Sequence, residues 1–318
     1  MANKNYSDDQ VARLQTPQRN LLINGQMDIW QRGTGPESVT SSPTYEAADR
    51  WTVERTGSGA GTCQASSTVP NSHYRNSYRL NSSDTGAKNF FVWQRVEGDT
   101  LVPFIGKTMH LGAWVMSTAG SIDTGLYAYS NPSQSRDVWA SSENLGNTEI
   151  LSIQNLSTVN NVWQYNGVNF TVTAECEDGL AIGFRFGTLD EIASYYVTGA
   201  RLHQGDSKLP WSDLRRTFGE ELELCQRYYE IGYVLATGVS YSTSAYYGHN
   251  YDYKVDKRVA PTMTYANERI WFNGSWVTPD TFTLTSRVEN GLGYGAHTGL
   301  TAYNGILCDF NYYADAEL

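Results

Sequence analysis

The sequence has few charged residues and no long apolar run. Asp, Glu, Lys and Arg make up only 18% of the 318 residues, and the formal net charge is −10. Because a phosphate backbone requires a basic surface on its partner, this charge balance excludes nucleic acid as a partner. No apolar run approaches the length of a membrane-spanning helix, so membrane insertion is not expected.

Cysteines and export signals are also scarce. Residues 1–19 contain no hydrophobic signal-peptide centre, which argues against Sec export. The four cysteines (Cys63, Cys176, Cys225 and Cys308) lie far apart and form no CxxC pair. This spacing predicts buried free thiols rather than a zinc site or a disulfide framework. We therefore expect the chain to fold in a reducing cytoplasm.

Aromatic residues and turn formers are abundant, with 22 Tyr, 9 Trp and 29 Gly. Short alternating segments separated by Gly, Asn and Ser predict a mostly β chain. We expect a jelly-roll or related β-sandwich over residues 20–211 and a small β domain over residues 234–318. The first sandwich should open with a strand, a turn at Asn24-Gly25 and a second strand, over Asn20–Gly33.

One helix is predicted between the two β regions, over residues 212–233. Its sequence from Asp213, DLRRTFGEELELCQRYYEIGY, has apolar residues at helical spacing, with Ser212 as a cap and Gly232 as a stop. Tyr228 and Tyr229 would point about 100° apart on a helix. We therefore expect one ring to pack on its own β domain and the other on a neighbouring chain or on the second domain. The pattern predicts an assembly role for Leu222, Tyr228 and Tyr229.

Residues 1–19 form a polar arm that buries too little apolar surface to be stable alone. Ser7 and Gln10 have the spacing of a capping box, and Pro17 would end a helix that starts there. The arm is predicted to attach the chain to a larger particle; a floppy terminus is the alternative.

Catalytic motifs are absent from the sequence. It contains no GxSxG elbow, and the five histidines are scattered. The acidic groups at 175–178, 190–191 and 220–223 lie at expected turns or at a helix start, which explains them without chemistry. We predict no enzyme activity, no catalytic residue, no metal site and no cofactor. TAECEDG at 173–179 leaves calcium open as an alternative, although it lacks an EF-hand pattern.

Exposed rings are the most informative candidates for binding. Sugars stack their apolar faces on aromatic side chains, and a run of rings among Ser, Gly and Asn is typical of a recognition loop. The predicted glycan-binding residues are Tyr246, Tyr247, Tyr251, Trp271 and Trp276. Packing of these rings between strands or between chains is the alternative. Five other tryptophans lie in strand-like contexts and are predicted to be core residues: Trp30, Trp51, Trp93, Trp114 and Trp163.

Four pieces of the sequence resemble a group of bacteriophage and prophage virion proteins, described as tail-fibre or receptor-binding proteins. They are NLLINGQMDIWQRGT from Asn20 with AADRW at 47–51, ELELCQRYYE at 221–230, KRVAPTMTY at 257–265 and ADAEL at 314–318. The N-terminal region is also similar to jelly-roll carbohydrate-binding modules. The shared motifs look structural, so no catalytic residue is carried over.

The resemblance implies a virion component, commonly a homotrimer, made in the host cytoplasm. On this interpretation the arm contacts other virion proteins, and the chain is a short fibre on the tail or head surface that recognises host surface polysaccharide. Two alternatives stay open: a head-decoration or adaptor protein without a ligand, and a glycan depolymerase.

Overall fold

A computed structural model of the chain describes residues 19–119, 123–130, 137, 148–154, 159–189, 191–206, 208–209, 214–239, 247–272, 275–278, 281–287, 291–297 and 305–317. The chain divides into two compact units, residues 1–221 with 318 and residues 222–317. The boundary falls inside helix α4 (Phe218–Gln226). Most of the predicted arm lies outside the described residues.

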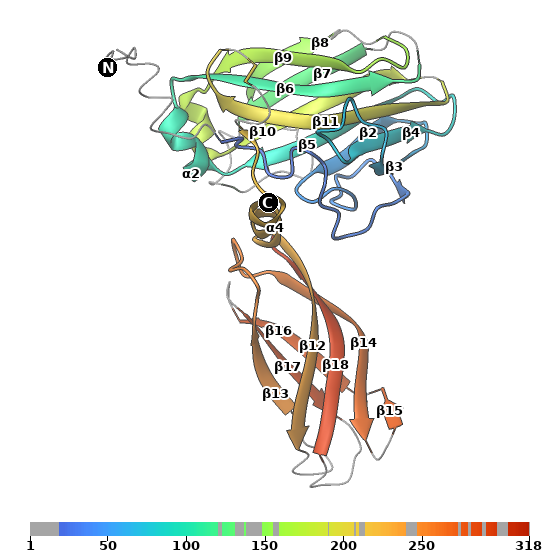
Figure 1. Cartoon of the computed structure of the whole chain (residues 1–318), viewed down its shortest axis with the longest axis vertical. Coiled ribbons are helices and arrows are strands. Elements are labelled where there is room, and N and C mark those ends of the chain that lie inside the picture. Colours follow the sequence, from blue (N-terminus) through green and yellow to red (C-terminus); the bar gives the residue numbers. More distant parts are fainter. Residues whose placement is uncertain are drawn as a thin grey trace, which may run out of the picture. The chain divides into compact units, whose positions relative to one another are not determined.

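Two antiparallel sheets make up the first unit (Figure 1). One sheet contains β1 (Glu37–Ser38), β3 (Gly61–Ser66), β4 (Ser77–Ser82), β11 (Ala193–Gln204), β6 (Thr108–Ser117) and β9 (Gln164–Thr171), in that spatial order. The other contains β2 (Thr52–Gly57), β5 (Lys88–Val96), β10 (Leu180–Leu189), β7 (Asp123–Ser130) and β8 (Thr148–Gln154). The short helices are α2 (Gly98–Leu101), η1 (Val102–Phe104) and η2 (Ala174–Asp178).

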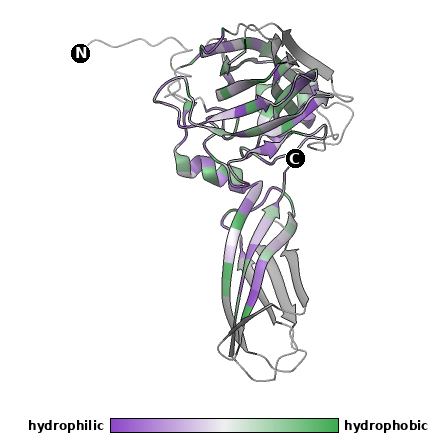
Figure 2. Ribbon diagram, turned by 90° about the vertical axis from the view of Figure 1, so that its right-hand side faces the viewer, coloured by the Kyte–Doolittle hydropathy of each residue, from purple (hydrophilic) through white to green (hydrophobic). Residues whose placement is uncertain are grey.

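The core of this unit draws on both sheets. Every second residue of β6 from Met109 to Val115 belongs to it, as do Ile182 and Phe184 of β10. Because side chains alternate along a strand, the intervening residues of β6, including His110 and Trp114, face away from the core. The alternation of hydrophobic and hydrophilic residues is visible along the strands in Figure 2.

The first segment, Asn20 to Gly33, is not the predicted pair of strands. It is irregular, and only the turn at Asn24 is present, where the Met27 amide donates to the Asn24 carbonyl at 3.0 Å. Asn24 takes a positive φ of 55°, and its side-chain amide donates to the Asp49 carbonyl at 3.0 Å. Trp51 Nε1 in turn donates to the Asn24 carbonyl at 3.0 Å. These tertiary bonds replace ladder bonds, and they join this segment to AADRW.

The predicted helix over 212–233 is real but much shorter. It is α4, and it begins after a capping box in which Thr217 N donates to Glu220 Oε2 at 2.8 Å and Glu220 N donates to Thr217 Oγ1 at 3.3 Å. Ser212, the predicted cap, lies outside the described residues. Tyr229 already belongs to strand β12 (Tyr229–Val239), where it pairs with Asp315. The ladder with β18 therefore ends the helix, and Gly232 is not its stop.

The second unit also consists of two antiparallel sheets. The four-stranded sheet contains β12, β18 (Gly305–Asp315), β14 (Thr262–Phe272) and β15 (Ser275–Val277), in that order. The three-stranded sheet contains β13 (Tyr247–Asp252), β17 (Gly291–His297) and β16 (Thr281–Arg287). The prediction of a mostly β chain with two sandwich-like regions is thus confirmed.

A buried ion pair joins two motifs of the second unit. Lys257 Nζ lies 2.7 Å from Glu230 Oε2, and both side chains are fully buried. Tyr312 donates its hydroxyl to the other oxygen of Glu230 at 2.5 Å. A Cβ on Gly232 would lie 2.1 Å from the Tyr312 ring, so glycine is required for that ring to pack across β12. CQRYYE and KRVAPTMTY are therefore linked through Glu230 and Lys257.

Candidate functional site

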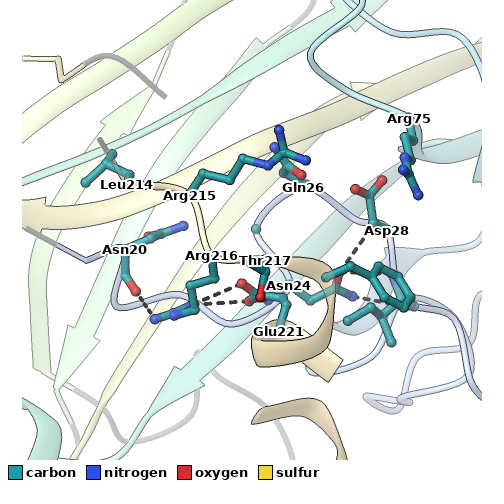
Figure 3. Close-up of a pocket in the computed structure, with 13 residues that line it drawn as sticks. Asn20, Asn24, Gln26, Asp28, Arg75, Leu214, Arg215, Arg216, Thr217 and Glu221 are labelled. Atoms are coloured by element: carbon teal, nitrogen blue, oxygen red, sulfur yellow. Dashed lines mark hydrogen bonds and ion pairs between the residues drawn. The ribbon is translucent and has the colours of Figure 1, made fainter. Parts of the chain in front are cut away.

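A small cavity lies in the first unit between the Asn20–Ile29 segment and residues 214–221 (Figure 3). Arg216 crosses it: Nη1 donates to the Leu22 carbonyl at 3.1 Å and pairs with Glu221 Oε1 at 3.2 Å, and Nη2 donates to the Asn20 carbonyl. Glu221 also accepts the Asn24 amide hydrogen. These bonds attach the start of α4 to the opening segment.

This cavity is too small for a ligand of sugar size. Its volume is about 50 Å³, enough for a few waters, whereas ligand pockets usually measure about 300–1,000 Å³. Asp28 on its wall has a pKa raised by burial, an effect opposed by Arg75 and Asn76. Arg216 and Glu221 bind each other and the backbone of the opening segment across it, so we assign the cavity a structural role.

A flat ring surface lies on the outward face of the six-stranded sheet, over β9, β6 and β11. Side chains stand in cross-strand rows: Trp114 pairs with Tyr165 and Thr198, and His110 pairs with Asn169 and His203. Trp114 and Tyr165 are half-buried, and their rings meet edge to face with centroids 5.7 Å apart. We call the surface formed by Trp114, Tyr165, His110 and His203 the ring platform.

Two glycines create the space in which Tyr165 lies. Gly112 and Gly167 face each other across β6 and β9 in the row between Trp114 and His110. A Cβ on Gly112 would meet the Tyr165 hydroxyl at 2.3 Å, so the phenol passes directly over this position. Its hydroxyl lies 2.9 Å from His110 Nε2, and the two rings are stacked at 12°. Tyr165 is thereby held flat on the sheet.

Two cations lie over the platform. The Arg201 guanidinium is 4.9 Å from the Tyr165 centroid, is almost fully buried, and donates to the Leu209 carbonyl at 2.7 Å. The ammonium of Lys208 is 4.0 Å from the Tyr165 centroid and 4.6 Å from that of Trp114. Burial and Arg201 lower the pKa of Lys208. Among the described residues, no carboxylate lies within ion-pair distance of Lys208.

The platform histidines are held neutral near pH 7. Burial lowers the pKa of His203 to about 4, with further lowering by His110 and Arg201, while a bond to the Gln204 carbonyl opposes the shift. Burial also lowers the pKa of His110, although its bond to Asn169 opposes this. Burial raises the pKa of Tyr165 to about 12. Lys208 and Arg201 therefore supply the positive charge at this surface.

A second pair of rings continues the platform along the strands. Half-buried Trp163 meets Tyr196 edge to face, with centroids 6.1 Å apart, and the Arg79 guanidinium lies 5.9 Å from the Tyr196 centroid. Tyr196 pairs with Met116, two residues beyond Trp114 on β6, which is a step of about 7 Å. Val162 beside Trp163 is 47% exposed. The two ring pairs therefore suit an extended ligand better than a single small one.

The predicted core tryptophans divide into two groups. Trp51 and Trp93 are fully buried, as predicted, although Trp93 belongs to a separate ring cluster with Phe91, Tyr127 and Tyr129. Trp30, Trp114 and Trp163 are only half-buried. Trp30 still packs against the core, but Trp114 and Trp163 lie on the outward face, so their assignment to the core was wrong.

The predicted glycan-binding residues are distributed over two sheets of the second unit. Tyr247 and Tyr251 belong to β13 of the three-stranded sheet rather than to a loop, while Trp271 and Trp276 are paired residues of β14 and β15. Tyr246 and the side chains of Tyr247, Tyr251 and Trp271 lie outside the described residues. Trp276 is 37% exposed, with the Arg269 guanidinium 4.7 Å from its centroid. Their common role stays a prediction.

An open hollow of about 520 Å³ lies near Trp276, lined by Tyr233, Asn267, Glu268, Arg269, Thr278 and Asn311. Arg269 forms two bonds to Asp309, at 3.1 and 2.6 Å, and the Tyr233 hydroxyl donates to the same carboxylate at 2.9 Å. The guanidinium charge is therefore compensated here, in contrast to that of Lys208.

The predicted assembly residues are largely buried in the single chain. Tyr228 and Tyr229 are 3% and 8% exposed, and Leu222 is half-buried. Tyr228 and Tyr229 follow α4 instead of belonging to it. Little of either ring is therefore exposed in the single chain, and the assembly role of these residues stays a prediction.

The acidic groups and cysteines show no metal-binding arrangement in the described part of the chain. Glu220 caps α4, and the Thr173 hydroxyl lowers the pKa of Glu175 by hydrogen bonding. No group of three or more His, Cys, Asp or Glu among the described residues could hold a metal ion. All four cysteines are buried free thiols, as predicted. Among the described helices, none is long and apolar enough to cross a membrane.

The chain matches no protein-family model and no curated protein. It is similar to the enzymatically active domain of bacteriophage CBA120 tailspike protein 4, with 15% identity and a TM-score of 0.40 over 60% of this chain and 22% of that chain. It is similar to TmCBM61 in complex with beta-1,4-galactotriose, with 12% identity and a TM-score of 0.36 over 59% and 99% of the two chains. A CBM22-1 xylan-binding domain from Paenibacillus barcinonensis shows 11% identity and a TM-score of 0.32 over 60% and 97%. Similarity this distant carries no argument about function.

The ring platform was missed in the sequence although a signal for it exists. Glycines inside strands mark close approach of a ring or backbone, and Gly112 and Gly167 both lie within expected strands. Each has a tryptophan or tyrosine two residues away, namely Trp114 and Tyr165. Pairing of these two short patterns would have indicated an aromatic surface.

Proposed function

We propose that this chain is a non-enzymatic virion protein of a phage or prophage, a short trimeric fibre that binds host surface glycans. The ring platform of the first unit is the proposed binding surface. The observation that carries the proposal is the outward line of half-buried rings, with Tyr165 laid flat over Gly112. Sugars bind by stacking on such rings while polar side chains bind their hydroxyls.

The virion and trimer parts of the proposal rest on the sequence motifs, which resemble those of phage fibre proteins. The non-enzymatic part rests on the sequence, in which turns and a helix start account for the acidic groups. Glycosidases need two carboxyl groups at a defined separation, one with a raised pKa.

The expected affinity is low. Two or three stacked rings at about 1 kcal/mol each correspond to binding in the millimolar range for one chain. Many copies on one particle raise the apparent affinity by avidity without new contacts. Weak binding by a single chain is therefore compatible with a role in attachment.

The test is a titration of host surface polysaccharide with wild type, Trp114→Ala and Trp276→Ala. Loss of binding in Trp114→Ala alone supports the ring platform, and loss in Trp276→Ala alone moves the site to the second unit. Binding by none of the proteins, together with normal adsorption of a phage lacking the chain, would favour an adaptor. Release of reducing ends would favour a depolymerase.

A further inference from the structure

The ring platform is positively charged although the chain as a whole carries a net charge of −10. Lys208 and Arg201 both lie over Tyr165. The positive charges of Arg201 and Lys208 both lower the pKa of the neighbouring His110.

The local charge decides which ligands the rings can accept. Aromatic faces also bind cations, but a cationic ligand here would meet Lys208 and Arg201 at short range. A neutral sugar could stack but would leave the ammonium of Lys208 without a charged partner. A sugar with a carboxylate can stack its ring on the aromatic side chains, and its negative charge attracts the ammonium of Lys208.

Lys208 is suited to this role by its exposure and its partners. It is an exposed residue whose ammonium lies over two rings, and it forms no ion pair with any described carboxylate. A lysine on a flexible stem can leave the ring faces and donate to an incoming carboxylate while the sugar takes its place on the rings. Arg201 is held by the Gly199 and Leu209 carbonyls and stays as fixed positive charge.

The second unit offers no equivalent surface in its described part. Arg269 lies over Trp276 in a comparable way, but Asp309 neutralises it through two bonds. An exposed ring next to a compensated cation favours neutral ligands. We therefore assign the selection of charged ligands to the ring platform rather than to the surface around Trp276.

We infer that the ring platform selects glycans whose sugars carry a carboxylate, with Lys208 as the residue that determines this selectivity and Trp114 and Tyr165 as the stacking surface. The inference rests on the proposed glycan-binding function and adds the ligand class. A charge-assisted bond lost from such a complex should weaken binding about 10- to 100-fold.

The experiment uses two matched pairs of probes: tetragalacturonate and tetrameric sialic acid, each with its carboxyl-reduced neutral counterpart. Full-length wild type, Lys208→Met, Lys208→Arg, Trp114→Ala and the control Lys254→Met are titrated at 50 and 500 mM NaCl. Lys254→Met removes one exposed positive charge from the second unit.

We expect wild type to prefer the acidic member of at least one pair by 10-fold or more, with a smaller preference at high salt. Lys208→Met should lose the preference, Lys208→Arg should keep most of it, and Trp114→Ala should weaken binding of both members. Lys254→Met should behave as wild type.

Equal binding of acidic and neutral members by wild type would overturn the inference and leave the proposed function intact. An unchanged preference in Lys208→Met would remove Lys208 from its role. If no probe binds, the carboxylate class is wrong, and the polysaccharide titration with Trp114→Ala decides the proposed function separately.

Discussion

Removal of Lys257 should destabilise the second unit more than loss of any exposed lysine. Its ammonium lies 2.7 Å from Glu230 Oε2, and both side chains are fully buried. At that distance the attraction is about 6 kcal/mol for an effective dielectric constant of about 20, and it is offset by the cost of burying both charges. Removing one partner leaves a buried charge, which typically costs about 3–5 kcal/mol. We expect a loss in this range for Lys257→Met.

The second substitution, Glu230→Gln, tests the physical reason. Glu230 also accepts from the Tyr312 hydroxyl at 2.5 Å and the Lys254 amide at 3.2 Å. Glutamine keeps an acceptor oxygen for these donors and removes the charge. The double variant Glu230→Gln/Lys257→Met should therefore recover at least about 2 kcal/mol relative to Lys257→Met.

Native-state hydrogen exchange of the β12 and β18 amides is the appropriate assay, because it reports the opening of the second unit separately from that of the first. Lys254→Met is the control: it removes a bond from an exposed Nζ to the Ile231 carbonyl and should cost less than about 0.5 kcal/mol. A loss below about 1 kcal/mol for Lys257→Met, or no recovery in the double variant, would refute the reasoning.

Four further predictions follow from other parts of the chain. Burial of His203 lowers its pKa from 6.5 to about 4, so the unfolded chain binds more protons between these values and stability should fall by up to about 3 kcal/mol as the pH drops from 6.5 to 4. Urea unfolding of His203→Gln should show a smaller pH dependence than that of the wild type, and an equal dependence in the two proteins would contradict this. Gly112→Ala should displace Tyr165, cost about 1–3 kcal/mol in urea unfolding and reduce glycan binding, and unaltered binding would argue against the flat-ring model. Light scattering at micromolar concentration should give the mass of three chains, and a monomer would exclude the trimer. A chain starting at Asn20 should melt at nearly the same temperature but fail to enter particles, and normal incorporation would rule out the attachment arm.

The general β architecture could be predicted because alternation and turn residues are local properties of the sequence. The existence of α4 was also local, since Thr217 and Glu220 form a capping box within four residues. The end of the helix is not determined by local sequence. It depends on the pairing of Tyr229 with Asp315, which lies 86 positions further along the sequence. The prediction of two strands for the opening segment was wrong for the same reason, because Asn24 bonds to Asp49 and Trp51 instead of to a hairpin partner.

The candidate site was harder to predict because periodicity does not show which face of a strand is outward. In β6, Leu111 and Trp114 are both large and apolar, yet Leu111 lies in the core and Trp114 on the platform. The contribution of Lys208 depends on a loop after β11 that returns over β6 and β9, a contact for which the sequence carries no local pattern. The tyrosine-rich run around Tyr247 was predicted as the binding site instead, because its rings are adjacent in the sequence.

The position of β18 imposes an order on biosynthesis. This strand is the last in chain order, yet it lies inside its sheet, hydrogen-bonded to β12 on one side and β14 on the other. The sheet therefore cannot close on the ribosome before Asp315 has been synthesised, and until then β12 and β14 present unpaired edges. The first unit has the same requirement earlier in the chain, since its last strand, β11, lies between β4 and β6 and ends at Gln204. A nascent chain should thus carry a finished sandwich ahead of an aggregation-prone segment, and termination before β18 should be much more damaging than its length suggests.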